Sequence, residues 1–187
     1  MDIVKPKHLR GGVKSRPMFW LIAAVLVAVY WAYRSGRFTE LPCGPGWLEA
    51  FKRNFVHVDL THLAANLVSF WILSRIELAK GSKHYAALIL VLLVLFTTGE
   101  VLLHLGQGPQ KCAIGFSGIL FGLLAWEIVT NHANLNGQLF VGLLLTLVGT
   151  SFKNPKASLQ GHALGVAVGL LAGFGTRIIQ SRANRSA

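Results

Sequence analysis

The sequence predicts an all-α membrane protein built from six transmembrane helices. Two observations support this fold class. Of the 187 residues, 53% are hydrophobic and only 13% are charged, and the apolar residues gather in six long stretches. Such stretches predict spanning helices, because a helix satisfies its own backbone hydrogen bonds inside lipid. The predicted spans run from Pro17 to Tyr33, His62 to Leu78, Tyr85 to Leu105, Phe116 to Thr130, Gln138 to Phe152 and Ser158 to Ile179.

The net charge of +11 favours lipid headgroups over nucleic acid as partners. With six crossings and the amino terminus inside, eleven of the 18 Lys and Arg residues fall on the inner side and seven on the outer side. This bias predicts that both termini are cytoplasmic. The basic segments 1–16 and 180–187 flank a predicted membrane domain of residues 17–179 and suit anionic headgroups. No basic stripe interleaved with aromatic residues indicates nucleic-acid binding.

The first span follows a basic segment, as the apolar part of a signal peptide does. Tyr30, Trp31 and Tyr33 occupy the place where small residues should precede a cleavage site, so the sequence predicts an uncleaved span. The outer segment from Arg34 to Thr61 has an apolar, aromatic middle. This pattern is compatible with a segment lying in the membrane interface and with an ordinary surface loop.

The two cysteines, Cys43 and Cys112, both fall in predicted outer loops. They could pair in an oxidising compartment, but the sequence favours two unpaired structural cysteines.

Polar residues enter the second and third spans. His62 and Asn66 are four residues apart and therefore share one face of a helix. They indicate either a functional site or a pair of interhelical hydrogen bonds, because polar groups inside a membrane need a partner or a watery cavity. Glu100 lies near the outer end of the third span, where it can reach the interface, and the sequence assigns it no role.

The fourth span opens with Gly115-Phe116-Ser117-Gly118. Glycines beside a serine let other backbones approach its hydroxyl, as a nucleophile needs. Phe121 lies one turn deeper on the face of Ser117. Taken alone, serine and glycine in such a helix are more often packing residues.

The fifth span carries no chemically informative residue, whereas the sixth has glycines at 161, 165, 169 and 173. Spacing by four leaves one side nearly bare, so Gly161, Gly165 and Gly169, with Gly118, are predicted to bring helices together. His162 lies beside this stripe. It indicates either a general base or a packing hydrogen bond.

Three alternate spans bring these groups to one depth. Spans two, four and six enter the membrane from the same side, and His62, Asn66, Ser117 and His162 all lie near their starts. The chemistry of an acyl transfer follows: Ser117 is the expected nucleophile and His162 the expected base. The Ser117 N–H with the side chains of His62 and Asn66 forms the expected oxyanion hole. No acidic third member is evident, so packing on Phe121 is expected to orient His162.

These motifs together resemble the rhomboid family of intramembrane serine proteases. The matching motifs are His57-x4-His62-x3-Asn66, Gly115-x-Ser117-Gly118 and Gly161-His162-x2-Gly165-x3-Gly169, with Glu77-x3-Gly81 as a further similarity. The first outer loop departs from the family's Trp-Arg pair, because Leu48 follows Trp47 and the nearest arginine is Arg53.

The resemblance implies a six-helix rhomboid-type bundle with a watery active site open to the non-cytoplasmic side. It implies a serine endopeptidase that needs no metal or cofactor. The implied substrates are single-pass transmembrane proteins cut near the membrane surface. A catalytically inactive rhomboid-like protein that binds and escorts membrane helices is the alternative, and retention of both Ser117 and His162 argues against it.

Overall fold

The computed structural model describes residues 15–37, 41–104, 114–130 and 159–185 of the chain. All regular structure within these ranges is helical. The helices are α1 (Pro17–Arg34), α2 (Trp47–Arg53), α3 (Leu60–Leu73), α4 (Arg75–Lys80), α5 (Ser82–His104), α6 (Ser117–Thr130) and α8 (Leu159–Ala183). The predicted span from Gln138 to Phe152 lies outside the described residues.

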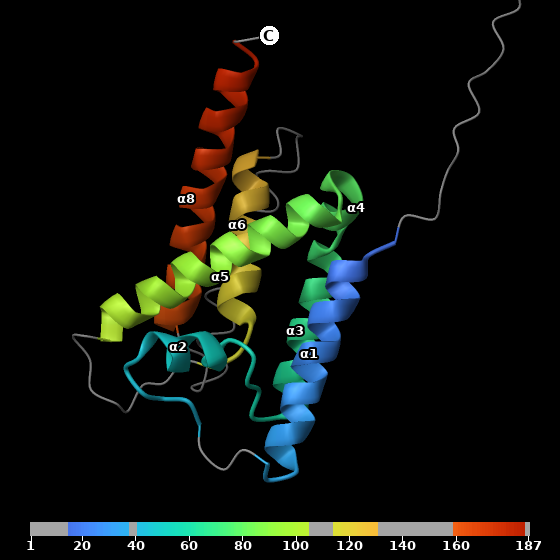
Figure 1. The fold of residues 1–187 in the computed structure, drawn as a ribbon, viewed down its shortest axis with the longest axis vertical. Coiled ribbons are helices and arrows are strands. Elements are labelled where there is room, and N and C mark those ends of the chain that lie inside the picture. The colour runs from blue at the N-terminus through green and yellow to red at the C-terminus, as the bar shows by residue number, and fades with distance from the viewer. Residues whose placement is uncertain (1–14, 38–40, 105–113, 131–158, 186–187) are drawn as a thin grey trace, which may run out of the picture.

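Three of the described helices, α1, α5 and α8, are long and apolar enough to cross a membrane, and α6 is a shorter apolar helix. In Figure 1, α1 lies beside α3, α6 lies beside α8, and α5 crosses obliquely in front of α6 and α8. The shared core includes Leu26 of α1, Phe70 of α3, Leu92 of α5 and Leu123 of α6, all fully buried. The all-α membrane prediction is confirmed at this level.

The second predicted span is not one continuous helix, because α3 and α4 are separated at Ser74. In an unbroken helix the Trp71 carbonyl would accept the N–H of Arg75. Here Ser74 Oγ donates to that carbonyl at 2.7 Å, and Arg16 Nη1 donates to it at 3.1 Å. Competing donors of this kind bend or break helices. The prediction of a single helix from His62 to Leu78 is therefore wrong at Ser74.

Glu77 on α4 fastens the start of α1. Its carboxylate oxygens accept the backbone N–H groups of Met18 at 2.9 Å and Phe19 at 3.0 Å. These donors belong to the first turn of α1, where they have no partner within the helix, and the negative charge suits the helix dipole. The break at Ser74 thus lets α4 cap a neighbouring helix.

Cys43, in the segment before α2, is disulfide-bonded. The expectation of two unpaired cysteines is therefore wrong at this position, and Cys112 lies outside the described residues. A disulfide requires two Cα atoms within about 7 Å of each other, and the sequence carries no information on the distance between two loops.

The glycine stripe of α8 faces α6. A Cβ atom added at Gly165 would overlap the backbone of Gly118, and one added at Gly169 would overlap the backbone of Gly122. One turn on, a Cβ at Gly173 would lie 2.7 Å from Val129 Cβ. These two helices therefore touch backbone to backbone, which side chains larger than hydrogen would prevent.

Candidate active site

Ser117 and His162 are brought together by the contact between α6 and α8. Ser117 is the first residue of α6, and His162 lies in the first turn of α8. His162 Nε2 lies 3.0 Å from Ser117 Oγ, which is hydrogen-bonding distance. His162 is buried and Ser117 is half-buried. In this geometry the Ser117 hydroxyl can donate its proton to a neutral His162 ring.

The His162 ring also contacts an aromatic residue. The Phe121 and His162 ring centroids lie 4.5 Å apart at an interplanar angle of 39°. His162 Nδ1 is buried and has no hydrogen-bond partner among the described residues. Packing on Phe121 thus restricts the ring where a triad would use a carboxylate.

Glycines surround the serine and histidine. The α carbon of Gly118 faces the ring of Phe96 on α5, which a Cβ atom would overlap. Gly165 faces the backbone of Gly118, while Gly161 is buried at the start of α8. These contacts set the separation of α6 and α8 at the level of the hydroxyl and imidazole.

His62 and Asn66 of α3 reach the same place through Gly115. A Cβ atom built on Gly115 would lie 2.6 Å from His62 Cε1, 2.8 Å from His62 Nε2 and 3.5 Å from Asn66 Nδ2. Both side chains therefore lie against the backbone two residues before Ser117. Ser117 opens α6, and its N–H belongs to the helix-terminal donors that lack an intrahelical acceptor.

Gly115 adopts a conformation that other residues avoid. Its φ is +107°, and its N–H donates to the Arg53 carbonyl at 2.9 Å. The left-handed φ and the close approach of His62 both favour glycine here. The segment before Ser117 is thus held from α2 on one side and α3 on the other.

His57 is a site residue whose role the sequence reasoning missed. Its Nε2 accepts a hydrogen bond from Asn66 Nδ2 at 2.7 Å, and its Nδ1 lies 3.2 Å from the Phe55 carbonyl. Because the Asn66 amide donates, Nε2 is the unprotonated nitrogen and Nδ1–H donates to Phe55. His57 therefore orients the Asn66 amide toward Gly115. The motif that includes His57 was the available signal, but spacing alone does not show which side chain it contacts.

Burial shapes the charge state of His57, which lies in the segment between α2 and α3. Burial, with the neighbouring His62 imidazole as a second cause, lowers the pKa of His57 to about 4. The ring is therefore neutral near pH 7, as acceptance of the Asn66 hydrogen bond requires. The His57 and His62 ring centroids are 4.9 Å apart.

Glu100, to which the sequence assigned no role, faces α2. Its Oε2 lies 3.7 Å from Arg53 Nη2, and both side chains are almost completely buried. From its place near the end of the third predicted span, Glu100 was expected to be able to reach the membrane interface. The structure instead buries its side chain against Arg53.

Comparison with known proteins agrees with this architecture. The Rhomboid domain family model matches residues 45–178. A protein of Acanthamoeba polyphaga mimivirus that bears the rhomboid name is 31% identical over 120 residues, a match covering 64% of this chain and 69% of the relative. Rhomboid-related protein 4 of Mus musculus is 34% identical over 136 residues, which covers 62% of this chain. Rhomboid-like protein 15 of Arabidopsis thaliana is 30% identical over 143 residues, which covers 64% of this chain.

The matched region is only part of the longer relatives. It covers 41% of the mouse protein and 34% of the Arabidopsis protein. The family model nevertheless spans more than half of this chain and includes the segments that carry His62, Asn66, Ser117 and His162. These matches confirm the resemblance seen in the motifs and show that the chain belongs to the rhomboid family.

Proposed function

We propose that the chain is an intramembrane serine endopeptidase that cleaves transmembrane helices of single-pass proteins near the non-cytoplasmic face. The observation that carries the proposal is the 3.0 Å separation of Ser117 Oγ and His162 Nε2. Membership of the rhomboid family and three membrane-length helices support the membrane setting. No metal or cofactor is needed for the chemistry.

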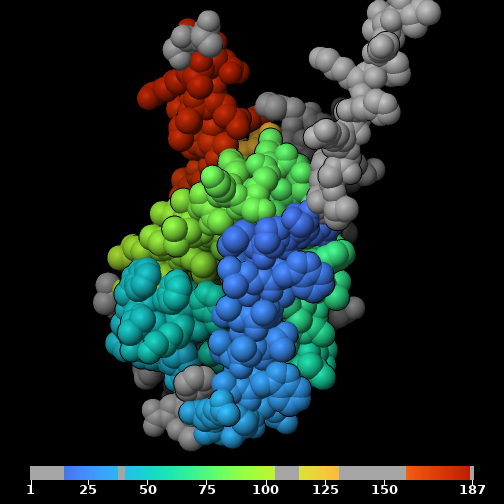
Figure 2. Space-filling view, turned by 45° about the vertical axis from the view of Figure 1, so that its right-hand side comes forward, coloured from blue at the N-terminus to red at the C-terminus, as the bar shows by residue number. Residues whose placement is uncertain are grey.

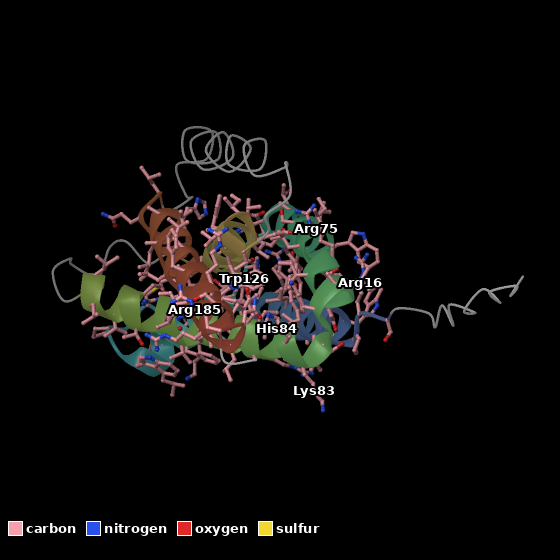
Figure 3. The ribbon with its side chains drawn as sticks, turned by 90° about the horizontal axis from the view of Figure 1, so that it is seen from above. Arg16, Arg75, Lys83, His84, Trp126 and Arg185 are labelled. Carbon is pink, nitrogen blue, oxygen red and sulfur yellow. The ribbon has the colours of Figure 1, made fainter. Side chains whose placement is uncertain are left out.

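The proposed topology has six crossings, with both termini in the cytoplasm. Arg16 precedes α1, Arg75 opens α4, Lys83 lies in the first turn of α5 and Arg185 follows α8, and Figure 3, seen from the end that carries the carboxyl terminus, labels all four. Basic residues gather at the cytoplasmic ends of membrane helices. Because α6 and α8 begin at the opposite end (Figure 1), Ser117 then opens to the non-cytoplasmic side.

The proposed reaction starts with the transfer of the Ser117 hydroxyl proton to His162 Nε2. Ser117 Oγ attacks the carbonyl carbon of the substrate peptide bond, and the carbonyl oxygen takes the π electrons as an oxyanion. The oxyanion reforms the carbonyl as the C–N bond breaks, while the imidazolium gives its proton to the leaving nitrogen. The amine fragment departs, and an acyl ester remains on Ser117.

Hydrolysis of the ester repeats the same steps with water. Neutral His162 takes a proton from water, which adds to the ester carbonyl, and then returns that proton to Ser117 Oγ as the acid product leaves. In both halves, the Ser117 N–H, His62 and Asn66 stabilise the oxyanion. One Asn66 amide hydrogen is held by His57, and the second is available for this purpose.

The test is labelling of the purified protein with a fluorophosphonate, together with cleavage of a transmembrane reporter in detergent. We expect Ser117→Ala to abolish both readouts. We expect His162→Ala to slow both by about 100- to 10,000-fold, the usual contribution of general acid–base catalysis. Ser69→Ala is the matched control, because Ser69 is an exposed serine on α3, and this variant should behave as wild type.

Two outcomes would contradict the proposal. One is equal processing of the reporter by wild type and Ser117→Ala. The other is a folded wild-type protein that binds the reporter helix but neither cleaves it nor reacts with the fluorophosphonate. The second result would favour the alternative of an inactive escort protein.

A further inference from the structure

The short helix α2 is joined to α5 by three polar contacts. Trp47 Nε1 donates to Thr98 Oγ1 at 3.3 Å, and Asn54 Nδ2 lies 3.4 Å from Thr97 Oγ1. The third contact is the ion pair between Arg53 and Glu100, at 3.7 Å. We refer to these three pairs as the polar seam. Figure 2 shows α2 seated under α5 and beside α1.

The ion pair is the buried part of the polar seam. Arg53 is 1% exposed and Glu100 is 4% exposed. Arg53 Nη1 also donates to the Gly44 carbonyl at 3.1 Å, which ties the segment before α2 to the same side chain. Removing one member of such a pair leaves a buried charge without compensation, which is strongly destabilising locally. The place of α2 against α5 therefore depends on this pair.

The backbone of Arg53 connects the polar seam to the candidate nucleophile. Its carbonyl accepts the Gly115 N–H at 2.9 Å, two residues before Ser117. On the other side of the serine, Gly118 packs under Phe96, which lies one turn from Glu100 on the same face of α5. The helix α5 thus contacts Gly118 directly and reaches Gly115 through Arg53.

We propose that Arg53 and Glu100 are positioning residues for Ser117, acting through the Arg53–Gly115 hydrogen bond. By holding α2 against α5, the pair sets where the backbone of residues 114–117 lies relative to His162 and to the donors on α3. The proposal rests on the serine protease function above. It gives the intramembrane acid Glu100 a purpose that packing of α5 alone does not require.

The test uses Glu100→Gln, Arg53→Met and the double variant Arg53→Met/Glu100→Met in detergent. All three keep the Arg53 carbonyl, so any effect on Ser117 must come through the placement of α2 against α5, and Gly115 exchange reports the part that reaches the serine through Arg53. For the single variants we expect fluorophosphonate labelling about 10-fold slower or more, because a displacement near 1 Å lowers reactivity by up to about 100-fold. The KM for the reporter should stay within about 2-fold of wild type. The double variant should regain part of the rate, since it leaves no lone charge.

Hydrogen exchange supplies a readout that does not depend on catalysis. The Gly115 amide should exchange faster in the single variants than in wild type, because its acceptor is displaced. Thr98→Val is the milder variant, to be used if the charge variants do not express. It removes only the exposed contact of the polar seam, so the fold should be kept. This variant should show the same two changes at smaller amplitude.

The matched control is the second ion pair, Arg75–Glu127, whose closest atoms are 2.8 Å apart between α4 and α6. Glu127 lies ten residues beyond Ser117, about 15 Å along the helix. Arg75→Met should lower the thermal midpoint but leave the labelling rate and Gly115 exchange unchanged.

The proposal is overturned if the polar-seam variants, matched in stability to Arg75→Met, retain wild-type labelling and wild-type Gly115 exchange. Absence of fluorophosphonate labelling in the folded wild-type protein would instead contradict the proposed protease function. In that case the exchange of Gly115 still decides whether the polar seam holds the segment before Ser117.

Discussion

At the scale of single residues, the state of His57 controls whether Asn66 is held. The Asn66 amide donates to His57 Nε2 at 2.7 Å, and only a neutral ring can accept. Protonation of His57 therefore breaks a buried hydrogen bond and places a charge at a buried position beside the His62 ring. This couples the integrity of the candidate oxyanion hole to pH.

We expect the stability of the protein to fall on acidification because of His57. Its pKa is lowered from 6.5 to about 4, by burial first. A lowered pKa favours the neutral folded form, so the contribution is complete above about pH 6.5 and is lost as the pH falls toward 4. The measurement is the thermal midpoint in detergent across this interval. His57→Gln, which cannot titrate, should show a shallower decline, and an identical decline in both proteins would contradict this role.

Gly115 gives a second prediction at this scale. In Gly115→Ala the new methyl group would meet His62 at 2.6 Å, in addition to the strain of a φ of +107°. We expect reporter cleavage to fall by about 100-fold, as for a displacement near 1 Å at a reacting group.

Gly81→Ala distinguishes the effect of backbone strain from the effect of a steric clash between the new methyl group and a neighbouring side chain. Gly81 has a φ of +87° but no atom within 4 Å of the added methyl group. This variant should lose about 1–3 kcal/mol of stability from backbone strain, because Gly81 combines its positive φ with a ψ of 156°, while keeping the cleavage rate of the folded fraction. Equal activity losses in the two variants would show that the contact with His62 is unimportant.

At the scale of helices, the contact between α6 and α8 depends on the absence of side chains. Gly169→Ala places a methyl group on the backbone of Gly122, whereas Gly175→Ala on the same helix meets nothing within 4 Å. We expect Gly169→Ala to destabilise the protein by about 1–3 kcal/mol, as overpacking does, and to lower cleavage by separating Ser117 from His162. Gly175→Ala should be neutral or stabilise by up to about 1 kcal/mol through helix propensity.

The same two variants test which face of α8 contacts α6. Thermal unfolding and cleavage rates measured side by side report both effects. If Gly169→Ala retained the stability and activity of Gly175→Ala, the backbone contact would have no energetic importance. Gly165→Leu, one turn closer to the serine, should lower both stability and cleavage, because its side chain would enter at the level of Gly118.

Periodic features of single helices could be predicted from the sequence, and contacts between irregular segments could not. Glycines every four residues and a histidine beside them indicate which face of α8 meets a neighbour. The break at Ser74 depends on Arg16, which lies 58 residues earlier and donates to Ser74 Oγ at 2.7 Å. No local pattern carries that contact, so the second span was expected to be continuous.

The same limit applies to the candidate site. Ser117 and His162 were expected to meet because alternate spans begin on one side of the membrane, and their atoms lie 3.0 Å apart. The hydrogen bond from Gly115 to Arg53 joins two segments without periodicity, and the disulfide-bonded Cys43 lies in a segment without regular structure. Such contacts follow from tertiary placement, which spacing does not encode.

At the scale of the whole molecule, a site near one end of the bundle constrains the substrate. A peptide bond inside a helix has its carbonyl hydrogen-bonded and is shielded from attack, so under the proposed function a substrate helix must unwind locally near Ser117. We expect reporters with Gly, Pro or Ser near the cut to be cleaved faster than matched reporters with Leu or Ala there. Each Gly lowers helix stability by about 1 kcal/mol relative to Ala, which corresponds to a rate increase of about 5-fold per residue if unwinding limits the rate.

The comparison requires reporters of equal hydrophobic length, with cleavage measured under single-turnover conditions. A control reporter carries the same Gly residues at the far end of its transmembrane segment and should be cleaved at the parent rate. Rates that ignore the position of the weak segment would contradict local unwinding as a requirement.

The backbone contact of α6 and α8 has a mechanical consequence. Gly165 and Gly169 meet Gly118 and Gly122 without rotatable side chains between them, so no rotamer change can adjust the spacing of these two helices. The two helices therefore form a rigid pair, with the Ser117 hydroxyl on α6 and the His162 imidazole on α8. Under the proposed function, any movement that admits a substrate must take place elsewhere in the bundle, and Ser117 and His162 keep their separation while it happens.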